Sequence, residues 1–221
     1  MIQCVGAREE KPPRAYCSRI CCMVAVKNAM LLKEWYPDSE VYIIYQDMQT
    51  YGKDYEEHYR KAREAGIKFV NYTKENPPEV TPLPDNRLRV SVYHALLGEK
   101  RELDCDLVVL STPLVQHESA KELSKILKVP LGQDEFFLEA HVKLRPVDFA
   151  TDGIYVCGTA HGPKDIGESI SQAYAVSSRA AGPMANRKVR TEAITAVVDR
   201  DRCVGCRMCE KLCPFGAHRI E

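Results

Sequence analysis

The sequence contains no run of apolar residues approaching the roughly 18 that span a bilayer, and it does not open with a basic segment followed by an apolar one. It also has no excess of either charge, because 31 Lys and Arg residues are matched by 31 Asp and Glu residues. These absences argue against membrane insertion and against binding of nucleic acid. We therefore expect a cytoplasmic protein whose partners recognise local surfaces.

A further absence concerns nucleotides. No G-x-G-x-x-G occurs in the 221 residues, so the chain has no sequence that would seat the ADP half of FAD or a nicotinamide nucleotide. A nucleotide-binding type of fold in this chain must therefore bind something other than a dinucleotide, or bind only the part of the cofactor that lies beyond its ADP half.

Strands and helices nevertheless alternate through the first half of the chain. Apolar residues recur at helical spacing over 20–36 (Val24, Ala25, Met30, Leu31 and Trp35), and Ser18 stands where it could cap that helix. Strands are expected at 41–45 and 67–70 around a charged helix at 51–65, followed by a β-ribbon at 88–93 and 103–110. This order predicts an α/β, Rossmann-like unit.

The chain has ten cysteines, which in the cytoplasm indicate metal or redox chemistry rather than disulfides. Cys105 and Cys157 lie inside apolar strand patterns and are expected to be small buried hydrophobes. The other eight form two groups. We call them the N-terminal cysteine set (Cys4, Cys17, Cys21 and Cys22) and the C-terminal cysteine set (Cys203, Cys206, Cys209 and Cys213).

The C-terminal cysteine set has the spacing of the bacterial ferredoxin run that holds a [4Fe-4S] cluster, C-x2-C-x2-C-x3-C-P. Gly205 leaves room for backbone amides near the sulfides, and Pro214 turns the chain away. Zinc is the chemical competitor, although structural zinc usually uses two separated ligand pairs. Cys213 serves either this cluster or a second one, and Met1, which stands in a strand pattern, favours a truncated chain.

Near residue 155 the sequence resembles the second flavin-contacting motif of thioredoxin-reductase-like flavoproteins, an apolar strand at 154–157 that ends in a glycine turn before a helix at 169–184. The resemblance implies flavin contacts from Gly158, Thr159, Ala160, Gln172 and Ala173. That family usually has Gly-Asp where this chain has Gly158-Thr159. Without the resemblance, the pattern is ordinary α/β architecture, and His161 is either a flavin contact or part of a solvated turn.

Three stretches are more specific: Gln3 to Glu9, Tyr16 to Cys22 and Gln46 to Lys53. They resemble the A subunit of heterodisulfide reductase, an iron-sulfur flavoprotein, in its middle-to-C-terminal part, so the chain is expected to be a fragment. The resemblance implies that the N-terminal cysteine set binds an additional [4Fe-4S] cluster near FAD. Because a different subunit of that family reduces the disulfide, no residue here is assigned as catalytic.

The resulting prediction divides the chain into a Rossmann-like domain with the N-terminal cysteine site (1–140), a flavin-binding-type segment (141–188) and a partial [4Fe-4S] ferredoxin-like domain (189–221). The resemblance implies an electron-transfer subunit of an electron-bifurcating oxidoreductase of methanogenesis. Its implied partners are other heterodisulfide reductase-type subunits, a hydrogenase or formate dehydrogenase module, and ferredoxin, in an oligomeric complex. Two alternatives stay open: a ferredoxin-like carrier or docking module without flavin, and a dithiol enzyme using Cys21 and Cys22.

Overall fold

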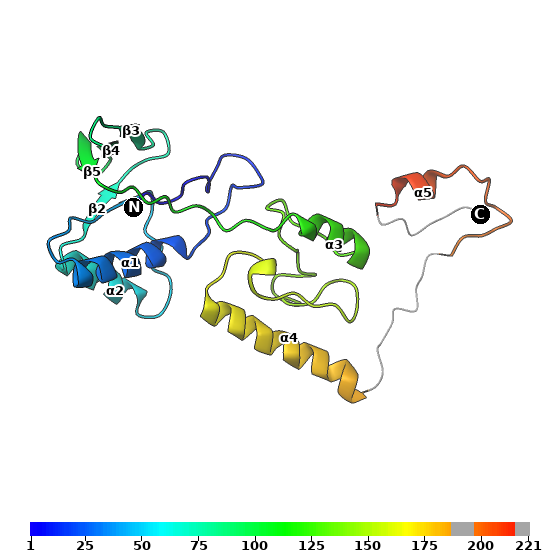
Figure 1. The fold of residues 1–221 in the computed structure, drawn as a ribbon. Coiled ribbons are helices and arrows are strands. Elements are labelled where there is room, and N and C mark those ends of the chain that lie inside the picture. The colour runs from blue at the N-terminus through cyan, green and yellow to red at the C-terminus, as the bar shows by residue number, and fades with distance from the viewer. Residues whose placement is uncertain (187–196, 215–221) are drawn as a thin grey trace. The chain divides into compact units, whose positions relative to one another are not determined.

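The structure, a computed structural model, describes residues 1–186 and 197–214 and has mixed α/β architecture (Figure 1). It forms two compact units. The first comprises Met1–Val115 and Gly162–Ile166, and the second comprises Gln116–His161 and the described residues from Gly167 onward. The division into domains at 1–140, 141–188 and 189–221 stays a prediction. The sequence also predicts a short strand at 194–198, of which residues 194–196 lie outside the described residues.

The first unit holds seven regular elements. They are α1 (Cys21–Trp35), β1 (Tyr42–Tyr45), α2 (Tyr55–Glu64), β2 (Lys68–Asn71), β3 (Glu79–Pro82), β4 (Leu88–His94) and β5 (Glu99–Cys105). The predicted helices and buried strands of this region are confirmed. The second strand of the β-ribbon was placed wrongly, because β5 begins directly after the turn at Gly98, whose φ of +69° suits glycine.

The centre of the first unit is a set of parallel segments. β1 and β2 pair in parallel, and Ile2 forms parallel bridges to Ile44 on one side and to Leu110 on the other. The backbone N–H of Ile2 donates to Val109 O at 2.8 Å, and that of Gln3 donates to Ile44 O at 2.8 Å. The spatial order is therefore β2, β1, the segment at Ile2, and the segment at Leu110.

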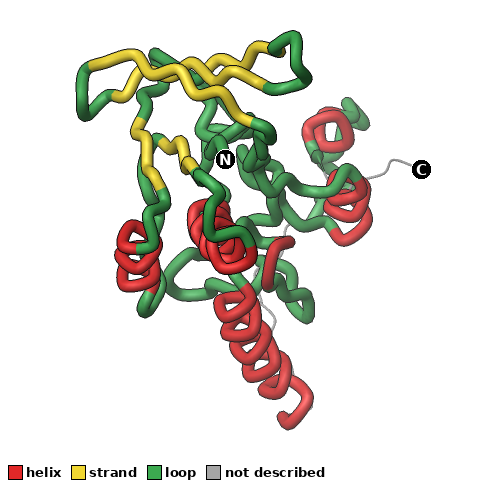
Figure 2. Tube along the Cα trace, turned by 60° about the vertical axis from the view of Figure 1, so that its left-hand side comes forward, coloured by secondary structure: helices red, strands yellow, loops and turns green. Residues whose placement is uncertain are grey.

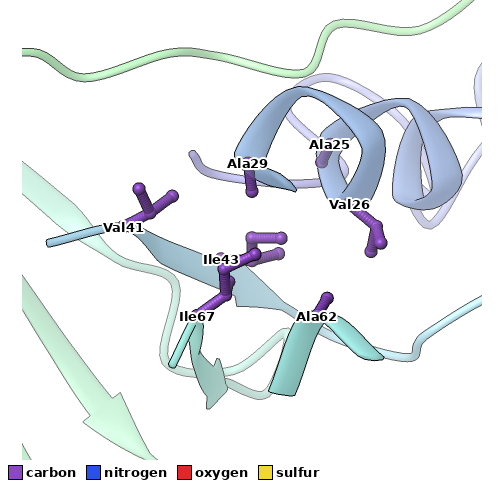
Figure 3. Packing of buried hydrophobic residues seen from close by; sticks show 7 residues of the cluster. All are labelled: Ala25, Val26, Ala29, Val41, Ile43, Ala62 and Ile67. Atoms are coloured by element: carbon purple, nitrogen blue, oxygen red, sulfur yellow. The ribbon is translucent and has the colours of Figure 1, made fainter. Parts of the chain in front are cut away.

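Successive residues of β1 enter different cores, because side chains alternate across a strand. Ile43 packs with α1 and α2 on one face, as Figure 3 shows for Ala25, Val26, Ala29, Val41, Ile43, Ala62 and Ile67. Ile44 packs on the other face with Ile2, Val70, Tyr72, Val90 and Val92. The antiparallel strands β3, β4 and β5, which Figure 2 shows as one group of strands, supply Val90 and Val92 from β4.

The buried face of α1 differs from the expected one. Its buried residues are Cys22, Ala25, Val26 and Ala29, at the i, i+3, i+4, i+7 spacing of a core-facing stripe. Val24 and Trp35 are 45% and 65% exposed. Small residues therefore bring α1 close to the strands. Ser18 does not cap α1; it is buried, and its Oγ accepts a hydrogen bond from Leu114 N at 2.9 Å.

The second unit holds α3 (Ser119–Leu127), the short 3-10 helix η1 (Gly158–Ala160), α4 (Ile166–Asn186) and α5 (Met208–Leu212). Its apolar core contains Ala120, Val129, Phe137, Phe149 and Val156. The strand predicted at 154–157 is only a single bridge, Tyr155 to Asp148. Buried Asp148 accepts hydrogen bonds from Arg179 Nε of α4 at 3.0 and 3.1 Å.

Among residues 1–186 and 197–214, no helix combines the length and the apolar character that crossing a membrane requires.

Candidate metal centres

The N-terminal cysteine set lies where several parallel segments end. Cys4 follows the segment at Ile2, and Cys21 and Cys22 are the first two residues of α1. Cys21 Sγ lies 3.9 Å from Thr112 O, just beyond Leu110, and Cys22 Sγ lies 3.7 Å from Asp47 O, just beyond β1. Ligands of α/β sheets bind at this carboxyl edge. The fold therefore places these thiols at an edge suited to a bound group.

Local backbone structure brings Cys4 and Cys17 toward one another. Ala7 N donates to Cys4 O at 3.2 Å, which closes a turn whose third residue, Gly6, has φ +75° as a type II turn requires. Beyond it, Arg8 N donates to Tyr16 O at 3.0 Å, and Glu9 N donates to Arg14 O at 2.9 Å. The loop between the two cysteines is thus folded back on itself.

The four sulfur atoms also influence one another electrostatically. Burial raises the pKa of the Cys4 and Cys21 thiols, and it raises the pKa of Cys22 to about 11. Burial is the largest cause, and the charges of neighbouring cysteines add smaller increases. Cys17 raises the pKa of all three thiols, and Cys4 and Cys21 also raise that of Cys22. The thiols therefore share one partly dry region, and binding of a metal there requires the loss of their protons.

The donor set fits an iron-sulfur cluster by its chemistry, because thiolates are the usual ligands of such clusters. Arg19 N–H also donates to Cys17 Sγ at 3.2 Å, the kind of backbone bond to sulfur that tunes a cluster. Within the described parts of the chain, however, no three Cys, His, Asp or Glu side chains are already arranged to hold a metal ion. The thiols are gathered but not at ligating distances.

Sequence reasoning missed one charged neighbour of this set. Arg8 Nη2 donates to Asp47 Oδ2 at 2.6 Å. Burial raises the pKa of Cys4, and the positive charge of Arg8 opposes that rise. A cavity of about 350 Å³ borders Cys4 and Arg8. Arg8 and Asp47 lie inside two of the family-like stretches, but nothing in the sequence pairs residues 39 positions apart.

The C-terminal cysteine set is more open. Cys203, Cys206 and Cys209 are exposed, Cys213 is half-buried, and Cys209 lies in α5. Cys213 N donates to Cys209 O at 3.2 Å, which closes the helix at its last ligand candidate. Gly205 has φ +66° with open space where a Cβ would stand, so backbone conformation explains this glycine.

Two of the flavin-type residues, Gly158 and Gln172, belong to a chain of hydrogen bonds within the second unit. Gly158 N donates to Gln172 Oε1 at 2.9 Å, Gln172 Nε2 lies 2.9 Å from His161 Nδ1, and His161 Nε2 lies 2.7 Å from Glu139 Oε2. Gly158 has φ +63°, while Thr159, Ala160 and Ala173 line the turn and the helix after it. His161 is therefore not simply part of a solvated turn. Glu139 was missed, because it stands in a linking segment without any periodic signal.

Cys105 and Cys157, expected as buried hydrophobes, are both half-buried. Cys105 packs at the edge of the core around Ile44, and its Sγ lies 3.6 Å from Leu103 O. Neither residue belongs to a group that could hold a metal ion among the residues described. Both therefore offer control positions for substitution of a cysteine.

Comparison with known proteins identifies one family model and a consistent set of relatives. The model, described as a 4Fe-4S binding domain, matches residues 195–218 and so includes the whole C-terminal cysteine set. It supports a [4Fe-4S] cluster at that set rather than zinc.

The relatives match all or nearly all of this chain. It is 47% identical over 221 residues to the A subunit of the H2:CoB-CoM heterodisulfide,ferredoxin reductase of Methanothermobacter marburgensis, covering 100% of this chain and 33% of that protein. It is 47% identical over 218 residues, 98% of the chain and 33% of the relative, to the iron-sulfur A subunit of the CoB--CoM heterodisulfide reductase of Methanocaldococcus jannaschii. A protein of Archaeoglobus profundus described as similar to the heterodisulfide reductase A subunit is 44% identical over 216 residues, 98% of the chain and 30% of the relative. The chain thus spans about a third of the length of the curated relatives it matches.

Proposed function

Because the chain belongs to the family of heterodisulfide reductase A subunits, we propose that it carries electrons between two [4Fe-4S] clusters within a heterodisulfide reductase-type complex. The C-terminal cysteine set binds one cluster, and Cys4, Cys17, Cys21 and Cys22 bind the other. Each cluster, when bound, supplies one-electron transfer at a potential that its surroundings set.

The observation that carries this proposal is the position of the N-terminal cysteine set at the carboxyl edge of four parallel segments. Their order, β2, β1, Ile2 and Leu110, is the order 3-2-1-4 found in Rossmann-type sheets, which supports a Rossmann-like interpretation of this unit. In such sheets the turn after the first strand is rich in glycine and holds a pyrophosphate. Here that turn carries Cys4, and thiols take the place of phosphate-binding amides.

We extend the proposal to a flavin beside the second unit. Gly158, Thr159, Ala160, Gln172 and Ala173 are the proposed contacts, supported by the glycine turn and by the hydrogen bond that fixes Gly158 against Gln172. By the resemblance to flavoproteins, these residues would contact the isoalloxazine end of FAD. They do not fit its ADP half, for which this chain has no glycine fingerprint. Residues of the complex outside this chain would bind that half.

Electron bifurcation at the flavin is the finer form of the proposal. A flavin accepts two electrons and one-electron carriers remove them separately, so clusters on the same chain suit this role. The names of relatives include H2, formate and ferredoxin. A hydrogenase or formate dehydrogenase module as donor, ferredoxin as an acceptor and further heterodisulfide reductase-type subunits are the partners we propose.

Anaerobic reconstitution of the full 221-residue chain tests the proposal. We expect roughly eight irons per chain from two cubane clusters, and two distinguishable electron paramagnetic resonance signals after reduction. Cys21→Ala should lower the iron content to roughly four and remove one signal while keeping the signal of the C-terminal cluster. Cys105→Ala is the matched control and should leave both signals unchanged.

The alternatives give different results in the same experiment. A ferredoxin-like carrier with one cluster binds roughly four irons and no flavin, and Cys21→Ala then changes neither quantity. A dithiol enzyme turns over thiols without iron. Retention of both cluster signals in Cys21→Ala would overturn the assignment of the N-terminal cysteine set.

A further inference from the structure

We propose that Arg8 and Asp47 form a charge pair that sets the reduction potential of the cluster at the N-terminal cysteine set. The inference rests on the proposed function, since it requires a cluster at that position. It gives both residues a tuning role: neither is a ligand, and neither takes part in a bond-making step.

Arg8 is held beside the cysteines by two hydrogen bonds. Its backbone N–H donates to Tyr16 O at 3.0 Å, and its guanidinium donates to Asp47 Oδ2 at 2.6 Å. It lines the cavity of about 350 Å³ together with Cys4. The Arg8 side chain is 30% exposed, whereas that of Asp47 is 63% exposed. The positive charge is therefore less hydrated than its partner and acts more strongly on the sulfur atoms.

Asp47 touches the cysteine set from a second side. Its backbone oxygen lies 3.7 Å from Cys22 Sγ, and its carboxylate holds the Arg8 cation, which borders the same cavity as Cys4. Cys4 and Cys22 lie 18 positions apart in the sequence. The Arg8–Asp47 ion pair therefore lies near both the first and the last cysteine of the set, and its charges can act on both.

The sign of each effect follows from charge. Reduction adds one electron to the cluster and no bond changes, so a nearby cation stabilises the reduced form and raises the potential, whereas a nearby anion lowers it. Removal of the Arg8 charge should lower the potential of this cluster. Removal of the Asp47 charge should raise it, because the cation then stands without its counter-ion.

The test uses the reconstituted full chain with Cys203→Ala added, so that only the N-terminal cluster contributes a signal. A redox titration followed by electron paramagnetic resonance compares Arg8→Gln, Arg8→Lys and Asp47→Asn. For Arg8→Gln, we expect the ratio of reduced to oxidised cluster at the parent's midpoint to fall about tenfold, which is about 59 mV for one electron. Asp47→Asn should shift the midpoint in the opposite direction, and Arg8→Lys should stay near the parent.

Arg14→Gln is the matched control. Arg14 is an exposed arginine of the same loop whose Nε lies 3.7 Å from Glu9, and its removal changes the net charge by the same amount. Equal midpoint potentials for Arg8→Gln and Arg14→Gln, or shifts of the same sign for Arg8→Gln and Asp47→Asn, would overturn this inference and leave the proposed function standing. A parent chain that takes up no cluster at the N-terminal cysteine set would overturn the proposed function together with this inference.

Discussion

The burial of Cys22 predicts how the stability of the iron-free protein depends on pH. Cys22 lies at the start of α1 with 4% of its surface exposed, and burial raises the pKa of its thiol from 9.0 to about 11. The folded state therefore keeps this proton at pH values where the unfolded state loses it. The resulting stabilisation is complete below about pH 9 and is lost as the pH rises toward about 11.

The size of the effect follows from linkage. A shift of two pKa units corresponds to roughly 3 kcal/mol, of which roughly 2 kcal/mol is lost by about pH 10.5. Equilibrium urea unfolding of the iron-free chain at about pH 8 and about pH 10.5 measures this loss. Other groups with raised pKa values, such as Cys4, Cys21 and Tyr72, add to it in the same direction.

Cys22→Ser isolates the contribution of one thiol. The serine hydroxyl does not titrate in this range and can still donate to Asp47 O, which the Cys22 thiol faces at 3.7 Å. We expect the serine variant to lose roughly 2 kcal/mol less stability than the wild type between the two pH values. Equal losses in both proteins would refute the reasoning that burial raises the pKa of Cys22.

Three further predictions concern packing and charge. Ile43→Ala should lower the free energy of unfolding by about 2–5 kcal/mol in urea titrations, because Ile43 of β1 is fully buried against α1 and α2, whereas Val24→Ala at an exposed position of α1 should cost far less. Arg179→Met should cost about 3 kcal/mol, since among the described residues it leaves the buried Asp148 carboxylate with Arg145, at 3.9 Å, as its ion partner, and an Asp148→Asn change in the same background should recover part of that loss. Gly158→Ala should lower stability by about 1 kcal/mol in thermal unfolding because of its φ of +63°, and a Gly182→Ala variant, at a helical position with open space around it, should not.

Much of the first unit could be predicted from sequence because its signals are local. The apolar run at β1, the glycine after α2 and the turn at Gly98 each depend on a few adjacent residues. The buried face of α1 could not be assigned from apolar spacing alone, because both large and small apolar residues follow helical spacing. Only the close approach of the strands selects Ala25 and Ala29 over Trp35.

The residues of the candidate sites also fall into those that the local sequence reveals and those that depend on distant partners. The eight cysteines were recognisable because their spacing is itself a chemical signal. Arg8, Asp47 and Glu139 were not, because each acts through a partner that is distant in the sequence and that only the fold brings near. The helix predicted at 169–184 begins earlier, at Ile166, and continues to Asn186, although a Gly-Pro pair normally predicts the end of a helix.

The folded loop between Cys4 and Cys17 has a consequence for the order of assembly. Bringing two residues 13 positions apart together in a free chain costs roughly 2 kcal/mol of loop-closure entropy. In this protein the backbone hydrogen bonds from Arg8 N–H to Tyr16 O and from Glu9 N–H to Arg14 O form when the polypeptide folds, and they offset that loss of entropy. On the proposed assignment, an incoming cluster would find both ends of the loop already close, and its insertion would follow folding rather than direct it.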